Sequence, residues 1–283
     1  IAPQEVIDKY GADVLRLWVA STDYSVDVSI GDNILQRTSD AYRRFRNTFR
    51  FLLGNLSDFD DQTNAVSNWD DLEPIDQYMM AKTAQLLSDV EQAYDSFKFN
   101  GVYRAVYDFV NDLSSVYMDV TKDRLYSESP DSPRRRAVQT VLFNILEVLV
   151  RVLSPILSFT ADEVWECYPE AMRNREGRVC NVQLAGWPHR SDFVPALPGK
   201  QAEEKVLAAF GGALEVRDVV TKALEDARGA KVINKSQEAT VSVTAPQATL
   251  DALSAFDASV FEELFIVSGV TFTAGDELAC EVK

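Results

Sequence analysis

The apolar periodicity of residues 31–56 limits what this chain can fold into more than any other feature of its sequence. Apolar side chains recur there at spacings of three and four residues and share one stripe of an α-helix: Tyr42, Phe45, Phe49, Leu52, Leu53 and Leu56. The segment therefore predicts one long amphipathic helix with a single buried face.

Helical patterns also occur on both sides of this segment: residues 3–20 as two short helices broken near Gly11, then 74–97, 102–126 and 132–153. Ser132 and Pro133 suit the N-cap and the first turn of the last helix. Pro155 ends that pattern, and Thr160 is a candidate cap for a further short helix that begins near residue 158. Together these segments predict a helical bundle.

Prolines and glycines are dense between residues 169 and 199, which predicts a linker there. A helix is expected over 201–228, and the alternation of Ala239, Val241 and Val243 with polar residues then predicts a strand. The remainder is expected to form two short helices and two strands: residues 247–256, 258–264, 265–267 and 270–273.

The expected fold is mainly α, with a helical bundle followed by a small α/β (α+β) domain. Its predicted parts are a docking remnant at residues 1–30, the bundle at 31–168, the linker at 169–199 and the α/β domain at 200–283. The first residue is isoleucine rather than methionine, which suggests that the chain was taken from a longer protein.

Net charge argues against binding nucleic acid by bulk electrostatics, since 28 Lys and Arg face 44 Asp and Glu for a total of −16. The distribution of charge is uneven, however. Basic residues cluster between residues 36 and 56, where Asp40 is the only opposing acid, whereas residues 58–76 are strongly acidic. A local basic surface therefore remains compatible with the sequence.

Two basic clusters are the candidate sites. The first is on the long helix and comprises Arg43, Arg44, Arg46 and Arg50. It is either a solvated helix flank or a phosphate track, because arginines three, four and seven residues apart lie on one side of a helix and suit phosphate oxygens.

The second cluster joins the end of one helix to the start of the next: Lys122, Arg124, Arg134, Arg135 and Arg136. Three arginines at a helix N-terminus oppose the helix dipole, an unfavourable arrangement that a bound anion would relieve. The alternative is a set of salt bridges to Asp123, Glu128 or Asp131.

Catalytic, metal and cofactor sites are not expected in this chain. His189 is the single histidine, and the three cysteines form no CxxC pair, which favours a reducing cytosol and no zinc site. No glycine-rich phosphate loop is present. No apolar run reaches the roughly 20 residues that span a bilayer, so we expect a cytoplasmic protein without a membrane role.

Several segments, in order along the chain, resemble class I aminoacyl-tRNA synthetases of the bacterial isoleucyl-tRNA synthetase type: YGADVLRLW at 10–18, DAYRRFRNTFRFLLGNL at 40–56, KDRLY at 122–126, residues 134–165, NVQLAGWP at 181–188 and KVINKSQEATV at 231–241. Residues 40–56 and 122–126 favour the isoleucyl type over its valyl and leucyl relatives. Gln237 departs from the family, which usually has leucine there. The family's ATP-binding signatures, editing domain and cysteine-rich zinc tail are not found in these residues.

The resemblance implies a parent isoleucine-tRNA ligase that uses ATP with Mg²⁺ and carries a structural Zn²⁺ in the missing tail. This chain would be its anticodon-binding part, inactive alone, with tRNA as partner and a monomeric state. Both basic clusters would then contact tRNA phosphates. Two alternatives remain open, namely a valyl-tRNA synthetase and a helical scaffold that binds another protein.

Overall fold

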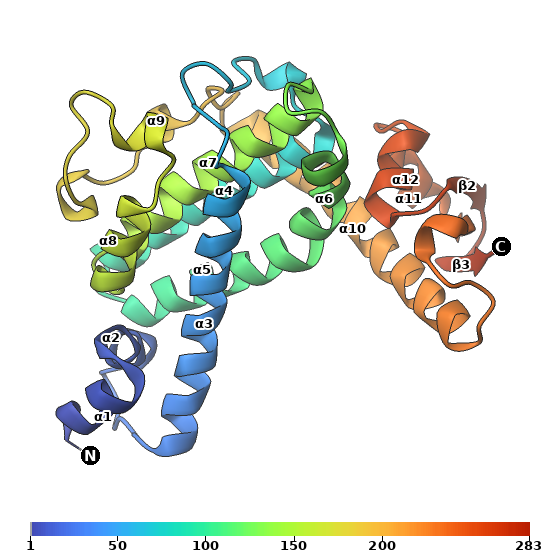
Figure 1. Cartoon of the computed structure of the whole chain (residues 1–283). Helices are drawn as coiled ribbons and strands as arrows, with labels where there is room; N and C mark the ends of the chain where they lie inside the picture. The colour runs from blue at the N-terminus through green and yellow to red at the C-terminus, as the bar shows by residue number, and fades with distance from the viewer. Residues whose placement is uncertain (1) are drawn as a thin grey trace. The chain divides into compact units, whose positions relative to one another are not determined.

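The long apolar stripe forms α3 (Asp32–Asn55) in a computed structural model that describes residues 2–283 (Figure 1). Phe45, Phe49 and Leu52 are at most 2% exposed. They are covered because α3 packs against α2, α5, α7 and α8. The helix predicted from periodicity is therefore present, with its apolar face inside a bundle.

Two compact units divide the chain. The first runs up to Leu72 and resumes over Lys82–Leu197, and the second comprises Glu73–Ala81 and Pro198–Lys283. The α-helices that lie wholly in the first unit are α1 (Pro3–Tyr10), α2 (Ala12–Ser21), α3, α5 (Phe99–Asp112), α6 (Met118–Ser127), α7 (Pro133–Leu153), α8 (Ser158–Glu166) and α9 (Glu170–Arg173). Helix α4 (Pro74–Asp95) contributes residues to both units. The mainly α prediction is confirmed.

Local sequence signals account for several helix boundaries. Gly11 separates α1 from α2 at φ 92°, a conformation that glycine adopts without a steric penalty. Pro133 occupies the first turn of α7, as predicted. Ser132 lies at the N-cap, but its hydroxyl donates to the Glu128 carboxylate instead of capping the helix. Residues 102–126 form α5 and α6, joined by a π-helical turn at Leu113–Tyr117.

Residues 169–199, predicted as a linker, contain α9 and two 3₁₀ turns, η3 (Val182–Leu184) and η4 (Arg190–Asp192). Nearly all of this segment belongs to the first unit. The Asn144 amide of α7 holds it, donating to the Val194 carbonyl at 2.7 Å and accepting from the Val194 N–H at 3.0 Å. The segment lacks long helices but packs against the bundle.

The second unit contains a three-stranded sheet with β1 in the centre. β1 (Thr240–Ala245) pairs parallel with β2 (Gly269–Ala274) and antiparallel with β3 (Ala279–Val282). The α-helices that lie wholly in this unit are α10 (Lys200–Gly229), α11 (Gln247–Leu253) and α12 (Ala258–Phe265).

The predicted alternation on β1 agrees with the buried side chains of Val241 and Val243. The strand predicted at 265–267 is wrong, because Phe265 ends α12 and Ile266 caps it in the left-handed region at φ 58°. The apolar run there therefore belongs to the end of a helix and not to a strand of the sheet.

Candidate nucleic-acid interface

Arg43, Arg46 and Arg50 lie on one side of α3, and we call them the α3 arginine flank. All three side chains are exposed, while Phe45 and Phe49 on the neighbouring face anchor the helix in the core. The geometry follows from the helical repeat, since residues three, four and seven apart are neighbours on a helix surface. The flank is therefore a row of guanidinium groups at the surface of the first unit.

Arg46 is held by Glu163 of α8 through two hydrogen bonds of 2.7 and 2.6 Å. These bonds raise the pKa of Arg46 and lower the pKa of Glu163. Both side chains remain about half exposed, at 46% and 54%, so the pair contributes little to stability. Arg46 is consequently positioned and stays accessible to solvent.

Arg43 and Arg50 are less restrained. Arg43 approaches Asp40 at 3.4 Å with its side chain 67% exposed. Arg50 has no hydrogen-bond or ion-pair partner among residues 2–283. These two guanidinium groups are therefore available to an external anion.

A groove of about 380 Å³ runs beside the flank between α3 and α8, and we call it the α3–α8 groove. It is lined by Arg46, Asn47, Phe49, Arg50 and Leu53 from α3, and by Thr160, Glu163, Val164 and Cys167 from α8 and the residue after it. Phe49 and Val164 are buried, whereas the amide of Asn47 and the two arginines are exposed. The groove combines an apolar floor with polar groups that can donate hydrogen bonds.

Arg44 does not join the flank. Its guanidinium donates to the Asn111 side chain and lies 5.3 Å from the centre of the Tyr107 ring, both on α5. Arg44 is one residue from Arg43 and therefore about 100° away around the helix. It faces a different neighbour, and we leave it out of the flank.

The second cluster is divided between surface and interior. Lys122 pairs with Asp119 at 2.9 Å, and Arg134 pairs with Glu128 at 3.0 Å with its side chain 47% exposed. Arg124 is only 2% exposed. A buried guanidinium cannot reach a phosphate on the surface, so Arg124 is not part of the interface that we propose below.

Arg135 and Arg136 hold the loop that follows α3. Arg135 donates to both carboxylate oxygens of Asp58 at 2.7 and 3.0 Å, and Arg136 donates to the Asp58 carbonyl at 2.9 Å. Gln139 donates to the same carboxylate at 2.8 Å. The two arginine side chains are 14% and 12% exposed. The sequence predicts that an anion would relieve the arginines at the start of α7. In the structure the Asp58 carboxylate, which is distant in sequence, pairs with Arg135 at that position.

Asp58 should make stability depend on pH. The hydrogen bond from Arg135 lowers the pKa of Asp58 to about 2, below its ordinary 3.8. A lowered pKa stabilises the fold above the ordinary pKa, and this stabilisation is lost as pH falls from about 4 through 2. Because the carboxyl is 39% exposed, we expect about 1 kcal/mol.

Urea denaturation at a series of pH values would measure this effect. In the isosteric Asp58→Asn variant, the free energy of unfolding should be lower near neutral pH and should fall less between about pH 4 and 2. Asp131→Asn is the matched control, since Asp131 is 95% exposed and contacts Arg136 only at 3.5 Å. Equal pH dependence in wild type and Asp58→Asn would contradict the assignment.

Among residues 2–283, no group of three His, Cys, Asp or Glu side chains lies close enough to hold a metal ion, and no helix is long and apolar enough to cross a membrane. Cys167, Cys180 and Cys280 are free thiols, and burial raises the pKa of Cys280.

Comparison with known proteins shows which family this chain resembles. Residues 76–243 match the family model described as the anticodon-binding domain of tRNA ligase. The chain belongs to this family. The matched residues of the tRNA-ligase anticodon-binding domain begin in α4 and end in β1, so α3 precedes them.

Curated relatives extend the similarity to α3. The chain is 45% identical over 98% of its length to the isoleucine-tRNA ligase of Geobacillus kaustophilus strain HTA426. It is 40% identical over its whole length to that of Natranaerobius thermophilus. It spans only 28% and 29% of these two relatives.

A solved structure shares the fold. It is the ternary complex of Agrobacterium radiobacter K84 LeuRS with tRNA and LeuAMS, which matches with a TM-score of 0.50 and 20% sequence identity. The match covers 69% of this chain and 22% of that one.

Proposed function

We propose that the chain is the tRNA-binding part of a longer isoleucine-tRNA ligase and that it positions the anticodon stem and loop. The observation that carries this proposal is the 45% identity to an isoleucine-tRNA ligase across 98% of the chain. Membership of the anticodon-binding domain family supports the same role.

The α3 arginine flank is the proposed phosphate-binding surface. Arg50 and Arg43 are free or weakly paired, and Arg46 is oriented by Glu163 without being buried. Arginine binds phosphate through a planar fork, and contacts to phosphates fix the register of a nucleic acid without reading its sequence. The flank would therefore set the register of the tRNA, since its groups project from one side of a single helix.

The α3–α8 groove is the proposed place for a base or ribose next to those phosphates. RNA loops present unstacked bases, which bind to apolar floors and to hydrogen-bonding groups at their edges. Phe49 and Val164 offer the floor, and Asn47 offers both a donor and an acceptor.

Lys122 and Arg134 extend the proposed interface to the second cluster, because both are at least partly exposed. Arg135 and Arg136 instead serve to hold the loop at Asp58. The net charge of −16 means that attraction to tRNA must come from such local groups rather than from the whole surface.

ATP, Mg²⁺ and any structural Zn²⁺ would bind to other parts of the longer protein. Residues 2–283 offer no cluster of His, Cys, Asp or Glu suited to a metal ion. We also propose that this longer protein acts in the cytoplasm as a monomer. The contribution of the present chain is placement of the RNA rather than chemistry.

A charging assay on the longer protein tests the proposed function. Isoleucine with its tRNA should be esterified in an ATP-dependent reaction, and valine with its own tRNA should not be. Preferential charging of valine would point to the valyl relative, and no tRNA binding at all would point to a protein scaffold. Either result would overturn the isoleucine assignment.

A further inference from the structure

Residues 24–30 expose an unusual number of apolar side chains. Every second residue is apolar, and their exposed fractions are 65% for Tyr24, 63% for Val26, 44% for Val28 and 36% for Ile30. Alternation with a period of two places these four side chains on one face of an extended chain. Such a pattern is typical of a β-strand that buries one face.

The backbone of residues 27–30 is unpaired, whereas residues 24–26 form a turn and a bend in which Asp23 accepts from the Ser25 and Val26 N–H groups. Residues 27–30 form no helix, turn or bend, and Gly31 is extended at φ −170° and ψ 166°. Within the part of the chain that the structure describes, the backbone N–H and C=O groups of residues 27–30 make no hydrogen bonds. An extended backbone with free donors and acceptors is a template for pairing with another strand.

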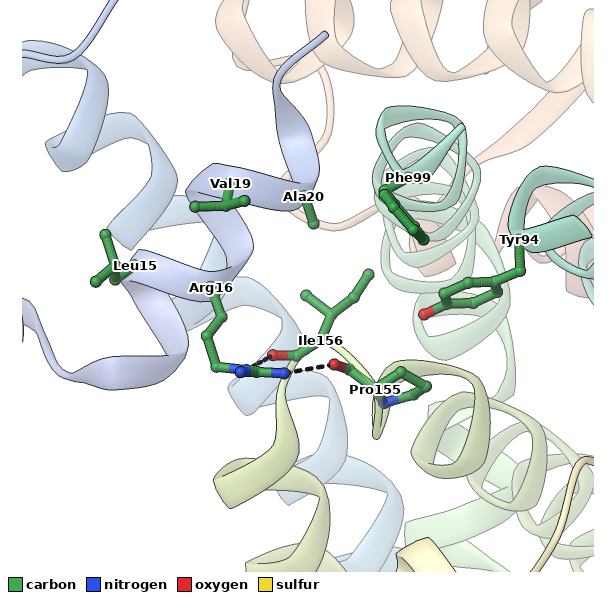
Figure 2. Close-up of a pocket in the computed structure, with 8 residues that line it drawn as sticks. All are labelled: Leu15, Arg16, Val19, Ala20, Tyr94, Phe99, Pro155 and Ile156. Atoms are coloured by element: carbon green, nitrogen blue, oxygen red, sulfur yellow. Dashed lines mark hydrogen bonds between the residues drawn. The ribbon is translucent and has the colours of Figure 1, made fainter. Parts of the chain in front are cut away.

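An apolar groove of about 380 Å³ lies in the first unit (Figure 2). Its lining residues are Leu15, Arg16, Val19, Ala20, Tyr94, Phe99, Pro155 and Ile156. Arg16, the one charged residue among them, is already engaged, because its guanidinium donates to the carbonyls of Ile156 at 2.8 Å and Pro155 at 2.7 Å (Figure 2). The groove therefore suits an apolar side chain rather than an ion.

The groove and the segment are linked through Tyr24. Its hydroxyl donates to the Phe97 carbonyl at 2.9 Å, two residues before Phe99 in the groove wall. Phe97 itself is 65% exposed and Val19 is 57% exposed. The segment, Phe97 and the groove thus form one apolar surface on the first unit.

We propose that residues 24–30 pair as a β-strand with an extended, mainly apolar segment of the same longer polypeptide, outside residues 1–283, whose neighbouring apolar side chain fills the groove. This inference rests on the proposed function in one respect, because it requires the longer protein. The curated relatives are long enough to supply such a segment, since this chain spans 28% of them.

Charge argues against a second copy as the partner. Asp27 lies in the middle of the segment, is exposed and has no partner among the described residues. Self-pairing centred on the segment would place Asp27 opposite or diagonal to its own copy, and like charges facing each other destabilise a sheet. The favoured partner strand therefore carries no acidic residue opposite Asp27.

Photo-cross-linking in the longer protein tests this inference. With p-benzoylphenylalanine in place of Val28, we expect an intramolecular cross-link to a peptide outside residues 1–283, several-fold above the same substitution at Leu184. Leu184 is a suitable control because it is an aliphatic residue with 63% exposure in the same unit. A cross-link within residues 1–283, a cross-link between two copies, or none above the control would overturn the inference.

Amide hydrogen exchange of the unsubstituted longer protein gives a second readout that no substitution can disturb. One partner strand protects alternate residues, so either Val28 and Ile30 or Asp27 and Ser29 should exchange about tenfold or more slowly than in an unstructured peptide. Fast exchange at all four amides would overturn the inference. Failure of the charging assay would leave both readouts unchanged, so the two proposals can fail separately.

Discussion

Replacement of Asp13 by alanine is expected to lower the free energy of unfolding of the first unit by about 2 to 4 kcal/mol. Asp13 is 5% exposed and accepts hydrogen bonds from the Thr160 N–H at 2.7 Å and the Thr160 hydroxyl at 2.6 Å. The Phe159 N–H approaches the same carboxylate at 3.4 Å. Alanine would leave the buried Thr160 N–H in the first turn of α8 without an acceptor, and the Thr160 hydroxyl would keep only the Tyr42 hydroxyl, at 2.9 Å, as a partner among the described residues.

Urea denaturation followed by circular dichroism would measure this loss. Asp8→Ala is the matched control, because Asp8 is exposed on α1 and its carboxylate accepts from the Gln4 side chain alone among the side chains of residues 2–283. We expect the control to change stability by less than about 0.5 kcal/mol. Equal effects of the two substitutions would show that Asp13 does not cap α8.

The triple variant Arg43→Ala, Arg46→Ala, Arg50→Ala in the longer protein is expected to weaken tRNA binding about ten- to hundredfold, or roughly 1.4 to 2.8 kcal/mol. The reason is that up to three guanidinium groups on one helix face can no longer bind phosphates. Folding should be unaffected, since all three side chains are exposed. Equilibrium binding of labelled tRNA at fixed salt would measure the change.

Two further variants test whether the loss of affinity depends on where the arginines lie or only on the change in net charge. Arg173→Ala removes an exposed arginine from α9, outside the proposed interface, and should leave tRNA affinity nearly unchanged. Glu163→Gln removes the carboxylate that holds Arg46 and should strengthen binding by a few-fold. If all three variants weakened binding equally, no specific flank would be needed to explain it.

Local signals predicted much of the fold. The apolar stripe of α3, the break at Gly11 and the start of α7 at Pro133 each depend on residues close together in sequence. The wrong strand at 265–267 came from an apolar run too short to reveal its period. The alternation at residues 24–30 is typical of a strand, yet these residues form none in the structure.

The candidate site was less predictable because its partners are distant in sequence. Thr160 was predicted to cap α8, yet it lies inside the helix and Asp13, 147 residues earlier, accepts its N–H. Asp58 meets Arg135 across 77 residues. Sequence periodicity does not identify such pairs. It also does not reveal that Arg124 is buried, because that burial results from tertiary packing.

Salt dependence of tRNA affinity tests the central claim, that the α3 arginine flank binds tRNA phosphates. The logarithm of the association constant of the longer protein should fall linearly with the logarithm of salt concentration. In the triple Arg43, Arg46 and Arg50 to alanine variant, this slope should be shallower by about 0.7 to 0.9 for each phosphate that is no longer neutralised, or about 2 to 3 in total. An unchanged slope and affinity would contradict the claim.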